Sequence, residues 1–335
     1  MPKKDKITYA KLIANPGAGN PSENSADVQR AVHWLHESGI EADVAFAKPK
    51  KEVTPITKRA LKDGYKLIIA MGGDGTIEAA LRGLIGSKAR LGMIPSGTEN
   101  NFAKSLGIPD DVEEACRLIV EQPVRKLDVG QVSVKGQKKT YFFELVSIGL
   151  SEALYHSAND LKEGNLARFK DAALNFLQEE TYPKVYLTLD DESKIEIETM
   201  LVVISNTPFF GNNFLVAPSA SLEDGLLDIS VYPNFRKAEL IAYYARIMNE
   251  GYSENDKVQR FRAREIEIKA SPKLEVVADG NKIGEGKAKI KVRPGAVSVI
   301  APPIGDESRA KDEVEQLPPP IYPAEEKDVL EKATS

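Results

Sequence analysis

Residues Leu67–Thr76 read LIIAMGGDGT, and this stretch decides the fold of the chain. Its five apolar residues predict a buried parallel strand, and the glycine-rich segment after them predicts a tight turn. The helical pattern that begins at Ile77 predicts a helix with Thr76 as its N-cap. Glycines remove the Cβ atoms where a backbone approaches a ligand closely, and the first N–H groups of a helix suit phosphate oxygens. The stretch is therefore predicted to bind phosphate.

A carboxylate inside this loop, that of Asp74, indicates more than passive binding. Because a carboxylate repels phosphate, its presence is easier to explain if it binds a cation or accepts a proton. Asp74 is therefore a candidate catalytic residue. The combination favours phosphoryl transfer over nucleotide binding alone.

The sequence around this loop alternates predicted strands with predicted helices. Strands are expected at residues 7–15, 41–47, 67–71 and 91–94. Helices are expected at 26–38, from Thr76 onward and at 99–106. A further helix is expected to begin at a Thr54 cap, with Pro55 at its first position, and to end at Gly64. Another is expected to begin at a capping box of Asp111 and Glu114 and to end at 122. This alternation predicts a doubly wound parallel sheet over residues 1–125, with helices on both faces and ligands at the carboxyl ends of the strands.

After Pro123 the sequence is dominated by predicted strands. They are expected at 127–134, 140–148, 184–189, 195–205, 226–232, 264–270, 274–278, 287–292 and 297–300, with helical patterns near 161–179 and 238–249. Several of these strands alternate apolar and charged residues, which predicts a mostly antiparallel β-sandwich over residues 126–304. Residues 305–335 are rich in proline and charge, and they are expected to form a disordered or loosely attached tail.

Length and composition bound the classes of function. The 335 residues suffice for about two domains, and the net charge of −5 with an isoelectric point near 5.6 argues against nucleic acid as the main partner. The sequence has no run of about 18 apolar residues and no apolar signal-peptide region at its start. Its single cysteine, Cys116, is expected to pack in the core. These features predict a cytoplasmic protein without a transmembrane segment.

Two further glycine-containing loops follow predicted strands. Residues 15–19 read Asn-Pro-Gly-Ala-Gly, and residues 95–101 read Pro-Ser-Gly-Thr-Glu-Asn-Asn. Because the carboxyl ends of parallel strands meet at one edge of a sheet, the three loops are expected to converge on one crevice. The sequence has neither the Gly-Lys-Ser/Thr of a Walker loop nor the Gly-x-Gly-x-x-Gly of a dinucleotide site, so a different kind of phosphate site is indicated.

These motifs resemble those of the bacterial diacylglycerol-kinase-like lipid kinases, which are relatives of sphingosine kinase and more distantly of NAD kinase. The resemblance extends over residues 7–302, and its hallmark is Gly72–Thr76. Further similar segments are NPxAG at 15–19, PSGTxNxFA at 95–103, LDVG at 127–130, SIG at 147–149, LEDGLLD at 222–228 and DG at 279–280. NAD kinase shares the Gly-Gly-Asp-Gly loop but not the Gly-Thr-x-Asn-x-Phe-Ala segment.

The resemblance implies an ATP-dependent kinase that phosphorylates a hydroxyl of an amphipathic lipid such as diacylglycerol, with Mg²⁺ as cofactor. Such a substrate implies contact with the inner face of the membrane, and a homodimer is left open. Together with the loops, the resemblance implies nucleotide-binding residues at Asn15, Gly19, Gly72, Gly73, Gly75, Thr76, Ser96, Gly97, Thr98, Asn100 and Asp279. It also implies a structural Mg²⁺ at Asp224, with backbone carbonyls near Ser221 and Leu226, although a plain Asp-Gly turn is the alternative.

The chain departs from the family pattern at acidic positions. The family usually has an aspartate where this chain has Asn101 and a glutamate where it has Asn281, and Glu144 stands in place of a family asparagine. Because Asn281 cannot accept a proton at neutral pH, Glu144 or Asp74 alone is expected to carry the proton transfer. Two alternatives stay open: a degenerate kinase that binds nucleotide or lipid in a regulatory role, and a kinase of a soluble acceptor, as in NAD kinase.

Overall fold

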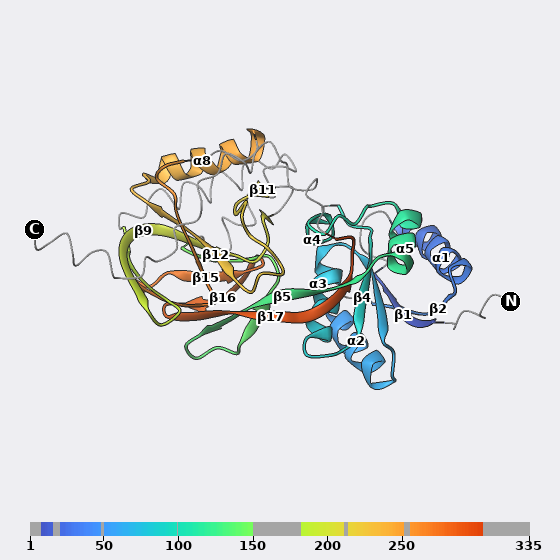
Figure 1. The fold of residues 1–335 in the computed structure, drawn as a ribbon. Coiled ribbons are helices and arrows are strands. Elements are labelled where there is room, and N and C mark those ends of the chain that lie inside the picture. Colours follow the sequence, from blue (N-terminus) through green and yellow to red (C-terminus); the bar gives the residue numbers. More distant parts are fainter. Residues whose placement is uncertain are drawn as a thin grey trace, which may run out of the picture. The chain divides into compact units, whose positions relative to one another are not determined.

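The computed structural model describes residues 8–15, 21–47, 50–98, 100–149, 182–210, 214–250 and 255–303, and the chain divides into two compact units (Figure 1). Among the described residues, unit 1 contains 8–129 and 294–303, and unit 2 contains 130–293. Unit 1 thus takes its last strand from the far end of the sequence. A division at 125 and 126, as expected from the sequence, assigns that strand to the second domain.

The core of unit 1 is a parallel sheet. Its strands are β1 (Thr8–Ala14), β2 (Ile40–Phe46), β3 (Leu67–Gly72), β4 (Arg90–Pro95) and the last part of β17 (Ala288–Ile300). Their order is β2-β1-β3-β4-β17, and β17 pairs with β4 in parallel where Val299 lies opposite Leu91. Every residue of β3 is buried, as expected for a parallel strand covered on both faces.

Helices cover both faces of this sheet. They are α1 (Pro21–Glu37), the 3₁₀ turn η1 (Lys50–Glu52), α2 (Val53–Lys62), α3 (Asp74–Leu84), α4 (Asn101–Lys104) and α5 (Val112–Glu121). Helix α1 packs against α5 and α2 packs against α3, and Figure 1 shows the two pairs on opposite faces. Cys116 of α5 is buried, which raises the pKa of its thiol to about 12. The prediction that it packs in the core is confirmed.

Several predicted helix boundaries are wrong, including the start of α1, which lies at Pro21 and not at residue 26. The N-cap of α2 is Glu52, and Thr54 lies inside the helix, where its hydroxyl donates to the Ala79 carbonyl of α3 at 2.6 Å. The predicted helix 99–106 is reduced to α4, because Asn100 takes a left-handed conformation with φ of 55° and the helix starts only after it. The capping box before α5 is confirmed, since the Asp111 carboxylate accepts the Glu114 N–H at 2.9 Å.

Unit 2 is a sandwich of antiparallel sheets. Its strands are β5 (Val124–Val134), which begins in unit 1, β6 (Thr140–Phe142), β7 (Leu145–Ile148), β8 (Lys184–Leu189), β9 (Ser193–Ser205), β12 (Leu227–Pro233), β13 (Gln259–Ala263), β14 (Glu265–Ser271), β15 (Glu275–Ala278), β16 (Asn281–Glu285) and β17. One sheet has the order β16-β15-β7-β9-β12-β13, and the other runs from β9 through β8, β14 and β17 to β5 and β6. A small hairpin of β10 (Phe209–Phe210) and β11 (Phe214–Leu215) lies apart from them.

The apolar residues of the two sheets meet in one buried cluster that includes Phe142, Val202, Ile229, Ile266 and Ile290. Helix α8 (Lys237–Glu250) contributes Tyr243 to a second buried cluster that also contains Tyr232 of β12. The predicted antiparallel β-sandwich is therefore confirmed. The helical pattern at 161–179 and the tail at 305–335 lie outside the described residues.

Some predicted strands of unit 2 differ from the observed ones. The expected strand 140–148 is broken at Phe143 and Glu144, and the two expected strands 287–292 and 297–300 form the single strand β17. Strands β13 and β16 were not expected. Within the described part of the chain, no helix is long and apolar enough to cross a membrane.

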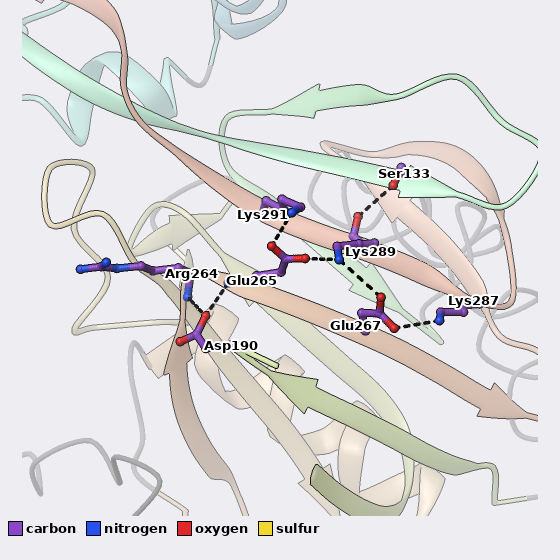
Figure 2. A network of polar contacts seen from close by, with 8 residues as sticks. All are labelled: Ser133, Asp190, Arg264, Glu265, Glu267, Lys287, Lys289 and Lys291. Atoms are coloured by element: carbon purple, nitrogen blue, oxygen red, sulfur yellow. Dashed lines mark hydrogen bonds and ion pairs between the residues drawn. The ribbon is translucent and has the colours of Figure 1, made fainter. Parts of the chain in front are cut away.

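The outer face of strands β14 and β17 carries a ladder of opposite charges (Figure 2). Glu265 lies opposite Lys291 and Glu267 lies opposite Lys289 in the antiparallel register. Glu265 pairs with Lys289 and Lys291, and Glu267 pairs with Lys287 at 2.7 Å. The lysines lower the pKa of both glutamates. The ladder therefore supports the register of the two strands through cross-strand ion pairs.

Candidate active site

The first glycine loop joins β3 to α3 in unit 1. Gly73 is the N-cap of α3 in an extended conformation, and the N–H of Thr76 donates to the Gly73 carbonyl at 2.8 Å. The predicted N-cap, Thr76, is therefore wrong, because that residue already lies inside the first turn. The first residues of α3 are thus part of the glycine loop, and the first N–H groups of a helix have no carbonyl acceptor four residues before them in the same helix.

The first and second glycine loops are in direct backbone contact. A Cβ added to Gly97 would lie 2.4 Å from the Cα of Gly73, and one added to Gly73 would lie 3.1 Å from the Cα of Gly97. The Ser96 N–H donates to the Gly72 carbonyl at 3.1 Å, and a Cβ at Gly72 would meet the Thr76 side chain at 2.6 Å. Glycine is therefore required at 72 and 97 for the two loops to lie this close.

Asn100 holds the second loop in shape. Its side-chain oxygen accepts the Gly97 N–H at 3.0 Å, and its amide nitrogen donates to the Gly97 carbonyl at 3.0 Å and to the Asp110 carboxylate at 2.8 Å. The residue is buried and left-handed. Asn100 therefore shapes the loop that exposes Thr98 at its tip.

The Asp74 carboxylate connects the two loops. It is half-buried at the start of α3, and its Oδ1 atom accepts the backbone N–H of Phe102 in α4 at 3.1 Å. On the other side of the loop, the Asn15 amide at the end of β1 donates to the Thr76 hydroxyl at 3.2 Å. Segments from three strand ends thus meet around Asp74, as the sequence predicts. Gly19 lies outside the described residues, and Gly75 lies in the first turn of α3.

Two other candidates, Glu144 and Asp279, lie together in unit 2. Asp279 and Gly280 have φ angles of 42° and 75° and form the tight turn between β15 and β16. The Asp279 carboxylate accepts the N–H groups of Phe143, Glu144 and Leu145 at 2.9, 3.0 and 3.2 Å. The turn therefore fixes the break between β6 and β7, where the buried Glu144 lies.

The two asparagines that depart from the family pattern have different surroundings. Asn281 is exposed at the start of β16, and its amide donates to the Asp279 carbonyl at 2.8 Å. Asn101 is buried in α4, where its carbonyl accepts the Ser105 hydroxyl at 2.9 Å. Asn281 thus supports the turn that places Asp279, while Asn101 is part of the packing around the second loop.

The loop predicted to hold a structural cation contains Ser221, Asp224 and Leu226. One Asp224 oxygen accepts the Leu226 N–H at 3.0 Å, and the other forms an ion pair with the Arg262 guanidinium. The Ser221 hydroxyl accepts the Glu223 N–H at 3.3 Å. Because a guanidinium already lies against the carboxylate that a cation would need, these side chains do not fit the predicted Mg²⁺. No cluster of metal-ligating side chains occurs elsewhere among the described residues.

Two family models match the chain. The diacylglycerol kinase catalytic domain family matches residues 9–132, and the YegS C-terminal NAD kinase beta sandwich-like domain family matches residues 144–301. The chain belongs to the diacylglycerol-kinase-like lipid kinase family.

Relatives of this lipid kinase family match most of the chain. A diacylglycerol kinase of Mycobacterium tuberculosis is 25% identical over 90% of this chain and 97% of its own length. A protein of Pseudomonas aeruginosa named probable lipid kinase YegS-like is 28% identical over 89% of this chain and 95% of its own length. Among solved structures, a putative diacylglycerol kinase from Bacillus anthracis aligns with a TM-score of 0.70 at 25% identity, over 90% of this chain and 99% of that one.

Three contacts of this family member could not be expected from its motifs. Asp110 supports Asn100 from ten residues away, and the Phe102 N–H that bonds to Asp74 depends on where α4 starts. Arg262 reaches Asp224 from β13, a strand that the sequence pattern does not reveal. The only sequence signal for Arg262 is the apolar and charged alternation of residues 259–263, which is too short to assign a partner.

Proposed function

We propose that this protein is an ATP-dependent lipid kinase that transfers the γ-phosphate of ATP to a hydroxyl of an amphipathic lipid such as diacylglycerol. Family membership supports kinase chemistry, and relatives of the chain carry the names diacylglycerol kinase and probable lipid kinase. The lipid itself is inferred from those names. A peripheral association with the cytoplasmic face of a membrane follows from such a substrate.

The observation that carries the proposal is the backbone contact between Gly73 and Gly97 at the N-terminus of α3. This contact brings the second glycine loop against the residue that caps α3, so the backbone of both loops lies at the N-terminus of that helix. Backbone amides and the helix dipole stabilise anionic phosphate oxygens. Phosphoryl transfer depends mainly on positioning and electrostatics, so a cradle of this kind supplies much of what the reaction needs.

Asp74 is the proposed proton acceptor. In the transfer, the acceptor oxygen forms a bond to the γ-phosphorus, the bond from that phosphorus to the bridging oxygen breaks, and ADP leaves. The hydroxyl proton passes to the Asp74 carboxylate, which the Phe102 N–H holds in place. Mg²⁺ bound with ATP would offset the phosphate charge, and contact with that ion is the alternative role of the Asp74 carboxylate.

The test is incubation with labelled ATP and a panel of diacylglycerol, monoacylglycerol, sphingoid base, ceramide and NAD. We expect a lipid of the panel to be phosphorylated, and Asp74→Asn to reduce turnover by 10²-fold or more, on the order of the usual contribution of a general base. Asp63→Asn is the matched control, because it removes an exposed carboxylate at the end of α2 in the same unit. Near-normal turnover in Asp74→Asn would remove this residue from the mechanism.

The second candidate is a degenerate kinase that binds its ligands without turnover. The amide of Asn281 favours it, because an amide cannot take up the proton of the lipid hydroxyl. This candidate predicts nucleotide binding with no turnover on any member of the panel. Asn281→Glu would then create activity that the wild type lacks. Phosphorylation of NAD alone would instead point to a kinase of a soluble acceptor.

A further inference from the structure

Strands β12 and β13 of unit 2 place an arginine against two carboxylates. Asp228 and Arg262 lie directly opposite each other in the antiparallel register. The Arg262 Nε atom donates to Asp228 Oδ2 at 3.3 Å, and its terminal nitrogen forms an ion pair with Asp224 Oδ2. The side chains are 13% exposed for Arg262, 8% for Asp228 and 30% for Asp224. One guanidinium therefore bridges the loop carboxylate and the strand carboxylate in a largely buried position.

All four carboxylate oxygens of this cluster have a protein donor. The other Asp224 oxygen accepts the Leu226 N–H at 3.0 Å, which closes a local turn, and the other Asp228 oxygen accepts the Ser219 hydroxyl at 2.6 Å. A hard cation such as Mg²⁺ needs several oxygen ligands in near-octahedral geometry. The carboxylates of the loop are instead committed to hydrogen-bond donors.

A second arginine of β13, Arg260, bonds to groups outside the cluster. Arg260 lies two residues before Arg262 on β13, so both side chains extend from the same face of the strand. Its guanidinium donates to the Ser230 hydroxyl at 3.0 Å and to the Val216 carbonyl at 3.3 Å. The Arg262 guanidinium, which lies against the Asp224 carboxylate, opposes the approach of a divalent cation to the loop by Coulomb repulsion.

We propose that Arg262 takes the place of a structural divalent cation at the 221–226 loop, so that this loop is held without a metal ion. The planar guanidinium can bond two carboxylates at once, which a lysine could not do with the same geometry. It neutralises Asp224 and Asp228 and ties the loop to β13. The inference concerns the stability of unit 2 and does not depend on the lipid kinase activity proposed above.

The test is thermal unfolding of the full chain without nucleotide, in excess EDTA and in millimolar MgCl₂. We expect the wild-type midpoint to be the same in both conditions. Arg262→Gln should lower the midpoint, and MgCl₂ should recover part of the loss, because two carboxylates are then left without their counter-charge. Arg264→Gln is the matched control, since it removes an exposed guanidinium two residues further along.

A wild-type midpoint that falls in EDTA, with a loss that Asp224→Asn abolishes, would overturn the proposal. A fall that persists in Asp224→Asn would place the ion elsewhere and leave the role of Arg262 intact. If Arg262→Gln does not fold, calorimetric titration of the wild type and of Asp224→Asn with MnCl₂ decides the matter. Equal heats for the two proteins support the proposal. Binding of Mn²⁺ to the wild type that is absent in Asp224→Asn contradicts it.

Discussion

At the scale of single residues, the contact between Gly73 and Gly97 sets the tightest requirement in the candidate site. The two positions differ in the space that a methyl group would have, with 3.1 Å to the nearest backbone atom at Gly73 and 2.4 Å at Gly97. Real Cβ atoms do not approach backbone atoms as closely as the second distance. The second loop must therefore move if Gly97 acquires a side chain.

Gly97→Ala is expected to weaken ATP binding by more than tenfold, because the loop must move away from the N-terminus of α3. The cost of such overpacking is typically about 1–3 kcal/mol. Gly73→Ala should have the smaller effect, since its contact is looser. Isothermal calorimetry with ATP measures both variants, and circular dichroism shows whether they are folded. Equal affinities for the wild type and Gly97→Ala would place the nucleotide away from these loops.

The sequence predicts which residues lie near Asp74, but it does not predict the hydrogen bonds that hold them there. Glycine loops after parallel strands must lie at one sheet edge, so the proximity of Asn15, Gly72 and Gly97 followed from pattern alone. The role of Asn100 as the clamp of its loop did not follow, because its partner Asp110 comes from a later segment. Side-chain hydrogen bonds of this kind depend on backbone angles that a motif does not specify.

At the scale of elements, alternation of residue types predicted strands and helices better than it predicted their ends. The buried run of β3 and the charged alternation of β14 identified their strands, because periodicity reports which faces are covered. The two wrong N-caps at Thr54 and Thr76 arose because each side chain has a partner outside its own helix end, Ala79 and Asn15 respectively. Tertiary contacts thus overrode the local capping preference.

The charge ladder of β14 and β17 makes stability depend on pH. Because the lysines lower the pKa of Glu265 and Glu267, these carboxylates stabilise the fold above the ordinary glutamate pKa. That stabilisation is lost as the pH falls through their lowered folded-state values. The double variant Glu265→Gln/Glu267→Gln should therefore unfold at lower urea concentration than the wild type at pH 7, and the difference should vanish in acid.

Urea unfolding followed by fluorescence at both pH values measures this difference. The double variant Asp191→Asn/Glu192→Gln is the control, because it removes two exposed carboxylates from the β8–β9 turn. High salt should shrink the effect of the ladder variant at pH 7, since exposed ion pairs are screened. A difference that stays the same in acid would mean that lost packing, and not charge, is its cause.

At the scale of the whole molecule, the candidate residues fall into two groups that belong to different units. Asp74, the two glycine loops and Asn15 lie in unit 1, whereas Glu144 and Asp279 lie in unit 2. The sequence-based prediction assigned Asp279 to nucleotide binding, yet its carboxylate holds three N–H groups of its own unit. The distribution of nucleotide contacts over the two units is therefore open to direct measurement.

Hydrogen exchange with and without a non-hydrolysable ATP analogue and Mg²⁺ gives that measurement. Ligand at a hundredfold excess over its dissociation constant stabilises the bound state by about 2.7 kcal/mol, which is enough to slow exchange of the amides that it covers. We expect protection in the segments 72–76 and 96–104 of unit 1, and weaker protection in the Gly97→Ala variant under the same conditions. Strands β8 and β14 of unit 2 should exchange as they do without the analogue. Protection of the 278–281 hairpin would add Asp279 to the nucleotide contacts, whereas protection confined to unit 2 would contradict the assignment of the phosphate cradle to the glycine loops.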